Sequence, residues 1–117
     1  MCARLMSQSM AYHVTHVFGE MDTPGLEDLG AVLDELANAD QEHFDVALSH
    51  ESGWTLSVFA GGRLVLENVE QRATERHTSG LDPLGRDKNM ILGLWTSLAQ
   101  GNVDQVIASL SWQPGYR

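Results

Sequence analysis

The sequence predicts an α+β domain in which two helices pack against a mainly antiparallel sheet of about five strands. Two runs with alternating apolar residues flank a glycine pair within residues 54–68, which is typical of a β-hairpin. Two further stretches, within residues 23–36 and 87–100, carry apolar residues at helical spacing. The predicted order of elements is β-α-β-β-β-(β)-α-β, with one strand optional, which is an α+β arrangement.

The chain has 117 residues, a length typical of one domain. A chain of this size buries enough surface to fold without a disulfide or a metal. Within this single domain, residues 1–117, we expect residues 1–10 to be disordered, and Met1, Met6 and Met10 are each a candidate start. The single cysteine excludes an intrachain disulfide. No signal peptide and no apolar run of transmembrane length is visible, so we expect a cytoplasmic protein.

Residues 11–18 alternate in polarity and are rich in β-forming side chains, so they are predicted to form the first strand. A helix follows, with Thr23 as its N-cap and Pro24 at its first position. The apolar residues that should face the sheet are Leu26, Leu29, Leu33 and Leu36. The acids on the opposite arc are Glu27, Asp28, Asp34 and Glu35. This helix is therefore expected to present an acidic face to water.

The register of the hairpin follows from side-chain parity, because a shift of one residue exchanges the two faces of a strand. A three-residue loop at residues 60–62 gathers the large apolar residues on one face. The pairs that this loop predicts are Val58 with Leu64, Leu56 with Leu66, and Trp54 with Asn68. It also places Gly62 where a left-handed backbone is needed. Phe59 and Val65 then face outward, either under partial cover or toward a partner.

The remaining elements are predicted from shorter patterns. Residues 43–50 form a second strand, whose core-facing residues are Phe44, Val46 and Leu48. Residues 72–79 are polar on both faces and form either a short edge strand or a loop. Asp87 caps a second helix that ends at Gly101, and the apolar arc of this helix is Ile91, Leu94, Trp95 and Leu98. Residues 105–112 form the last strand, with one face made by Val106, Ala108, Leu110 and Trp112.

The net charge of the chain is −9, and the acidic excess lies in the first half of the sequence. Residues 1–51 contain ten acids and one base, Arg4, whereas residues 52–117 contain six acids and six bases. Such a field repels nucleic acid and anionic membranes and attracts a basic partner. The alternative is that these acids only form a solvated face that keeps the protein soluble.

No catalytic, cofactor-binding or metal-binding set of residues is recognisable, so we expect neither an enzyme nor a metal or cofactor. His13 and His16 are three residues apart on a strand and therefore point to opposite faces. Ser49, His50 and Glu51 are the residue types of a nucleophile triad, but consecutive residues do not bring their side chains together. The sequence has neither a Gly-x-Ser-x-Gly elbow nor the Pro-Cys-x-x-Cys motif of zinc-dependent deaminases. The five histidines are expected to lie at the surface or at sheet edges.

Several residues, together with the order of elements, resemble a known family over about residues 11–113. The matching residues are Thr23-Pro24 before the first helix, Gly62-x-Leu64 in the hairpin, Gly101 after the late helix and Trp112 at the end. This pattern is similar to the first-numbered immunity-protein family of bacterial polymorphic-toxin systems. Members of that family are small α+β proteins encoded beside secreted toxins, notably nucleic-acid deaminases, which they bind and neutralise. The matched positions are structural, so the resemblance assigns no toxin-contact residue.

The charge and the resemblance together imply an immunity protein that binds a basic cognate toxin and occludes its active-site groove. An acidic helix face and the loop after it would mimic phosphates there and would steer fast association. The candidate partner-binding residues are Asp28, Asp34, Glu35, Asp40, Glu42, Asp45 and Glu51. The alternative is a small homo-oligomeric binding or regulatory module, which would dimerise through the hairpin or the last strand, with Trp112 as an anchor. Neither hypothesis makes nucleic acid or a membrane the ligand.

Overall fold

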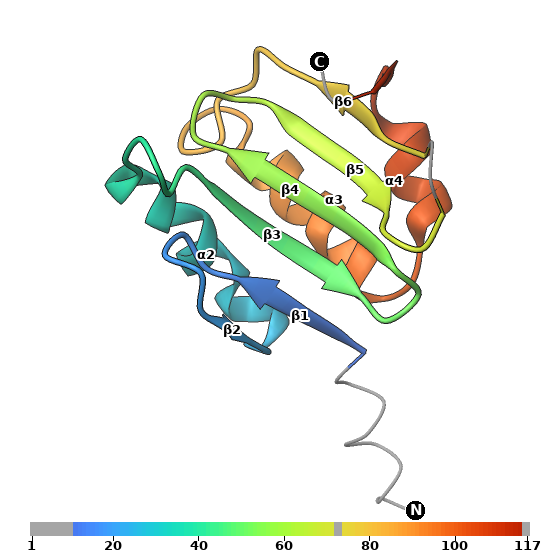
Figure 1. Cartoon of the computed structure of the whole chain (residues 1–117), viewed down its shortest axis with the longest axis horizontal. Coiled ribbons are helices and arrows are strands. Elements are labelled where there is room, and N and C mark those ends of the chain that lie inside the picture. The colour runs from blue at the N-terminus through green and yellow to red at the C-terminus, as the bar shows by residue number, and fades with distance from the viewer. Residues whose placement is uncertain (1–10, 72–73, 116–117) are drawn as a thin grey trace, which may run out of the picture.

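The computed structural model describes residues 11–71 and 74–115, which form one antiparallel sheet with helices on one of its faces (Figure 1). The strands are β1 (Tyr12–Thr15), β2 (Met21–Asp22), β3 (Asp45–His50), β4 (Trp54–Phe59), β5 (Leu64–Asn68), β6 (Arg76–Thr78) and β7 (Gln113–Pro114). The α-helices are α2 (Leu29–Asp34), α3 (Lys88–Ala99) and α4 (Val103–Ser109), and the 3-10 helices are η1 (Leu26–Asp28) and η2 (Glu35–Asn38).

The order of strands in the sheet is β2-β1-β3-β4-β5-β6-β7. The predicted α+β class and antiparallel sheet are therefore confirmed, but the described residues form seven strands and three α-helices, more than the predicted five and two. The expected disorder of residues 1–10 and the three candidate starts lie outside the described residues, as do residues 72–73.

The two additional strands are two-residue segments at the two edges of the sheet. β1 ends at Thr15 rather than at residue 18, because the chain turns there and the His16 N–H donates to the carbonyl of Glu20 at 2.7 Å. β2 then pairs with β1. Near the other edge β6 lies within the polar segment 72–79, so the strand alternative is confirmed, but β6 is not the edge, because β7 pairs with its outer side.

The central hairpin has the register that side-chain parity predicts. Val58 pairs with Leu64, Leu56 with Leu66, and Trp54 with Asn68. Gly62 closes the three-residue loop with φ at +97°, a left-handed conformation that glycine adopts readily. A Cβ on Gly62 would also lie 2.2 Å from the carbonyl oxygen of Leu81, so glycine is needed there for space as well.

The first helix begins later than the sequence pattern predicts. Thr23 does not cap it, because its hydroxyl donates to the carbonyl of Tyr12 at 3.2 Å, and the Tyr12 hydroxyl donates to the carbonyl of Pro24. This exchange holds residues 23–24 against β1, and helical turns start only after Gly25. The leucine arc shifts accordingly: Leu26 is exposed, and the buried residues of the segment are Leu29, Val32, Leu33 and Leu36.

The second helix, α3, has the predicted buried residues Ile91, Leu94, Trp95 and Leu98. Its first helical residue follows Asp87, as predicted, but the Asp87 side chain makes no cap hydrogen bond to the helix and instead accepts from the Asp82 N–H at 2.8 Å. The Trp95 indole donates to the carbonyl of Leu56 at 3.0 Å and so joins this helix to the hairpin.

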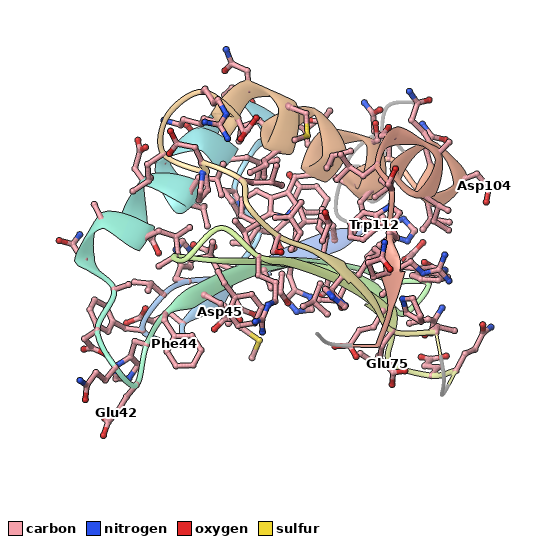
Figure 2. All side chains as sticks on the ribbon, turned by 90° about the horizontal axis from the view of Figure 1, so that it is seen from above. Glu42, Phe44, Asp45, Glu75, Asp104 and Trp112 are labelled. Carbon is pink, nitrogen blue, oxygen red and sulfur yellow. The ribbon has the colours of Figure 1, made fainter. Side chains whose placement is uncertain are left out.

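The predicted last strand, residues 105–112, is wrong, because most of this segment is helix α4. Apolar residues at positions 103, 106, 107 and 110 also fit helical spacing, and in that register Val106 is fully buried. The Trp112 indole donates to the carbonyl of Val106 at 3.3 Å, which places the ring between α4 and the sheet (Figure 2). Trp112 is thus part of the packing of α4.

The layers leave one face of the sheet uncovered by any described helix (Figure 2). The core lies between the helices and the opposite face, and its sheet residues are Val14, Val46, Leu48, Leu56, Val58, Leu64 and Leu66. We call the uncovered side the free face. Side chains alternate between the two faces of a strand, so the free face carries the other parity set.

Candidate functional site

The free face is lined mostly by short side chains. One row of cross-strand neighbours crosses the whole sheet, and its members are Met21, Thr15, Ala47, Ser57, Val65, His77 and Gln113. In the next row the Thr55 hydroxyl donates to the Ser49 hydroxyl at 2.9 Å. The predicted outward orientation of Val65 agrees with this register, although Val65 is buried between Ser57 and His77. The middle of the face is therefore flat and weakly polar.

Large apolar side chains gather at one end of the sheet, where β1 and β4 end and β3 begins. Phe18, Met21 and Phe44 are 51%, 66% and 44% exposed there. The Phe44 ring stacks on the Phe59 ring with centroids 5.9 Å apart, and Phe18 contacts the ring of His43 at 5.1 Å. We call Phe18, Met21, Phe44 and Phe59 the apolar patch. Exposed apolar residues gathered in this way mark an interaction surface more often than scattered ones do.

The prediction that Phe44 faces the core is wrong. Phe44 precedes β3, and its carbonyl accepts from the N–H of Ala60 at 2.8 Å, so its backbone is tied to the hairpin loop. Its ring lies on the side of the sheet away from the helices, near Asp45 (Figure 2). Alternation along residues 44, 46 and 48 predicts the opposite orientation, because it assumes that the strand already includes residue 44.

Asp45 is the acid most closely associated with the apolar patch. It is the cross-strand neighbour of Phe59 and belongs to the parity set of the free face. The side chain is half-buried, and this burial raises the pKa of its carboxyl. Within residues 11–71 and 74–115, no hydrogen bond or ion pair reaches the Asp45 carboxylate. A carboxylate that is partly desolvated and has no partner binds a cation at a lower further cost in desolvation than a fully hydrated carboxylate does.

The loop before β3 brings further acids to this end. The Asp40 carboxylate accepts the backbone N–H of Glu42 at 2.9 Å and that of His43 at 2.7 Å, and these bonds lower the pKa of Asp40. They fix the loop in an ordered turn. The Glu42 side chain is exposed and projects from the outer corner of the molecule, beyond Phe44 (Figure 2). Glu20, in the turn between β1 and β2, is also exposed.

Three of the seven acids that the sequence nominates, namely Asp40, Glu42 and Asp45, lie in the loop before β3 and at the start of β3. Two others are engaged in the helical layer. The Lys88 ammonium lies 2.6 Å from the Asp34 carboxylate, and a Glu35 carboxylate oxygen lies 2.6 Å from Nδ1 of His16. The acidic helix face that the sequence predicts is thus partly neutralised within the chain.

The last two nominated acids lie elsewhere. Burial raises the pKa of Tyr12, and the charges of Glu27 and Asp28 raise it further, which places Asp28 near the start of β1. Glu51 lies in the turn between β3 and β4, at the opposite end of β3 from Asp45. Sequence reasoning also missed Phe18 and Met21, since a turn at Gly19 separates them and no periodicity links them.

A hollow of about 320 Å³ opens beside the stacked rings. Its lining residues are Phe44, Phe59, Ala60, Gly61, Arg63 and Ser79. Arg63 is exposed and directly precedes β5. The Phe59 N–H donates to the Arg63 carbonyl, so Arg63 lies across from Phe59 on the side opposite β3. Phe59 therefore stands between a carboxylate on one strand and a guanidinium on the other.

A larger hollow of about 530 Å³ lies at the opposite end of the sheet, beside the turn between β3 and β4. The titratable side chains at its margin are Tyr12, His13, His50, Glu51 and Glu70. His50 is engaged with the Ser52 hydroxyl at 2.8 Å. Among the described residues no three His, Cys, Asp or Glu side chains group closely enough to hold a metal ion.

Among the residues that the structure describes, His16 is the one histidine with two acidic partners. Its Nδ1 lies 2.6 Å from Glu35 and its Nε2 lies 2.7 Å from Asp22, while the other Glu35 oxygen accepts the Val17 N–H at 3.0 Å. Burial alone would lower the pKa of His16, but the hydrogen bonds and charges of the two carboxylates outweigh it and raise the pKa. As predicted, His13 and His16 point to opposite faces, with His13 exposed on the free face.

None of the helices in the described part of the chain is long and apolar enough to cross a membrane. Comparison with known proteins adds no relative: no family model, no curated protein and no solved structure matches this chain.

Proposed function

We propose that this protein is an immunity protein that binds and neutralises a cognate toxin by occluding the basic groove in which the toxin holds nucleic acid. The observation that carries the proposal is the apolar patch at one end of the free face, with Asp40, Glu42 and Asp45 around it. The family resemblance of the sequence supplies the class of partner.

An apolar centre with a charged margin is the usual composition of a protein-binding surface. Aromatic residues contribute much of the binding energy at such sites, while charges at the margin set orientation and association rate. Phe18, Phe44 and Phe59 supply the aromatic groups here. The acids match a basic groove, and the net charge of −9 attracts such a partner over a longer range.

The contact is proposed to lie on the loop and the start of β3 rather than on the acidic side of the first helix. Asp34 and Glu35 are held by Lys88 and His16, so engaging them would break contacts that the fold already makes. The Asp40 carboxylate is likewise bound, by the N–H groups of Glu42 and His43, so the phosphate positions are assigned to the exposed Glu42 and to Asp45, which has no partner among the described residues.

The alternative function, a homo-oligomeric module, would use the same free face against a second copy. A twofold contact through the patch would bring the acids of one copy toward those of the other in a protein that is already strongly negative. We therefore favour a basic partner over a second copy.

The experiment that tests the proposal is co-expression with the C-terminal domain of the secreted protein encoded beside this chain's gene. If the chain is its immunity protein, the toxin domain alone arrests growth, and co-expression of the chain restores it. Two variants with the same change of charge refine the result. Glu42→Lys should weaken protection, whereas Glu51→Lys, at the far end of β3, should preserve it. Growth arrest that the wild-type chain does not relieve would contradict the proposal.

A further inference from the structure

We propose that the Asp45 side of the apolar patch binds an arginine side chain of the partner, with the guanidinium paired to the Asp45 carboxylate and stacked on the Phe44–Phe59 ring pair. This deepens the proposed function and rests on it only for the identity of the protein that presents the arginine. The chemistry of the site is argued from this chain alone.

The first argument is geometric. Asp45 and Phe59 are directly opposite each other on adjacent strands, and residues so placed have Cβ atoms about 5 Å apart. The Phe44 ring stacks on the Phe59 ring, with centroids 5.9 Å apart and 28° between the ring planes, and Phe44 remains 44% exposed. A cation is attracted to an aromatic face within about 6 Å of its centre. One planar group can therefore contact a ring and the carboxylate together.

The second argument is the state of the carboxylate. Asp34 and Glu35 have cationic partners in the chain, whereas Asp45 has none among the described residues. Its side chain is already half-buried, which the raised pKa of its carboxyl reflects. Part of the desolvation that an ion pair requires has thus been completed during folding.

The third argument selects arginine over lysine. A guanidinium is planar, donates two parallel hydrogen bonds to a carboxylate, and loses its water more easily than an ammonium does. The chain itself contains an arginine–aromatic contact on the other side of the sheet, where the Arg76 guanidinium carbon lies 5.7 Å from the Trp54 ring centre.

Arg63 determines on which side of the Phe44–Phe59 ring pair the ligand binds. It lies on the flank of Phe59 opposite Asp45 and is exposed. Its charge repels a second guanidinium from that flank, so the arginine is directed over Asp45 and Phe44. Removing this charge should tighten binding, which is the reverse of what a merely structural role of Arg63 would give.

The test uses the whole chain labelled with ¹⁵N and a synthetic acetylated pentapeptide amide, Gly-Leu-Arg-Leu-Gly, followed by NMR titration. We expect shifts in the amide signals of residues 43–47 and 57–63, with little change at the turn between β3 and β4. The matched peptide in which lysine replaces arginine should bind severalfold more weakly.

Variants of the protein assign the contacts. Asp45→Asn and Phe44→Ala should each weaken the arginine peptide by about tenfold. Glu51→Gln, which removes the same charge at the far end of β3, should leave it unchanged, and Arg63→Gln should strengthen it. Phe44 is exposed and Asn is isosteric with Asp, so both weakened variants should remain folded, which a cooperative thermal unfolding transition in each confirms.

Three results would overturn the inference: no shifts at any soluble peptide concentration, shifts centred on residues 49–53, or equal weakening by Asp45→Asn and Glu51→Gln. These results are independent of the co-expression experiment. Binding of the arginine peptide at Asp45 without protection from the toxin would uphold this inference and refute the proposed function. Protection by a chain whose patch does not bind the peptide would support the proposed function and refute this inference.

Discussion

Some charged side chains of this protein are paired with groups of opposite charge, whereas Asp45 has no such partner among the described residues. His16 is hydrogen-bonded to two carboxylates, and they raise its pKa. A group whose folded pKa lies above its unfolded pKa stabilises the fold fully below the unfolded value, and that stabilisation is lost as pH rises through the folded value. The unfolded value for histidine is about 6.5.

The first prediction concerns His16→Gln. It should lower the free energy of unfolding by about 1 kcal/mol below about pH 6, since Asp22 is largely exposed and contributes little. The loss should shrink as pH rises through the raised folded pKa of His16, because the neutral imidazole of the wild type no longer pairs with both acids. Urea unfolding of both proteins across this range measures the effect. A constant difference at every pH would show that His16 acts only by packing.

Asp45 shows the opposite linkage, and it gives the second prediction. Its carboxyl has a raised pKa in the folded state, so the folded form binds the proton more tightly than the unfolded form does, and stability falls as pH rises through this region. Asp45→Asn should therefore melt at the same temperature as the wild type or higher near pH 7. This gain should disappear below about pH 3.8, where both states are protonated. Thermal unfolding of the variant and the wild type at neutral and acidic pH measures this difference in melting temperature. A destabilised variant at neutral pH would mean that the charged carboxylate has a stabilising partner.

At the scale of elements, the hairpin loop is the connection with the strictest requirement. Gly62→Ala should cost about 2 kcal/mol or more, because its left-handed backbone disfavours a side chain and the Leu81 carbonyl occupies the space. The matched control is Gly61→Ala, since a Cβ at Gly61 meets nothing within 4 Å. Chemical denaturation of the two variants compares them. Equal costs would mean that the loop adopts another register.

Local sequence patterns predicted some elements well and others poorly. Parity fixed the hairpin because only one loop length placed Leu64 and Leu66 inward together. The segment 103–110 was ambiguous, since its apolar residues satisfy a period of two and a helical period, and only packing of Val106 in the core decides between them.

The candidate site was harder to predict than the fold. Glu35 and His16 lie 19 residues apart, and no local rule pairs them. The exposed Phe44 ring depends on where β3 begins, which is the least certain feature of any pattern. The role of the nominated acids stays a prediction; the sequence could not show which of them are paired within the fold, because charge can be counted along a sequence whereas its neutralisation depends on tertiary contacts.

The whole molecule carries a net charge of −9, and the fourth prediction concerns its range of action. Association with a basic toxin domain should slow steeply as salt rises, because screening shortens the reach of the field to about 8 Å at physiological ionic strength. Dissociation should change little, since it depends on the apolar patch. Stopped-flow or surface-plasmon measurements at several salt concentrations separate the two rates. A salt effect confined to dissociation would indicate a contact dominated by buried ion pairs.

The two-residue strands at the edges of the sheet have a further consequence for which substitutions the sequence can accept during evolution. With β2 and β7 short, and with Pro114 lacking an N–H, the edges offer little backbone to which another chain could add a strand. The proposed partner would then be recognised through side chains on the free face, whose central strands are paired on both sides. Such positions can be substituted one at a time without disturbing the ladder, so under the proposed function the partner could change over generations while the framework stays the same.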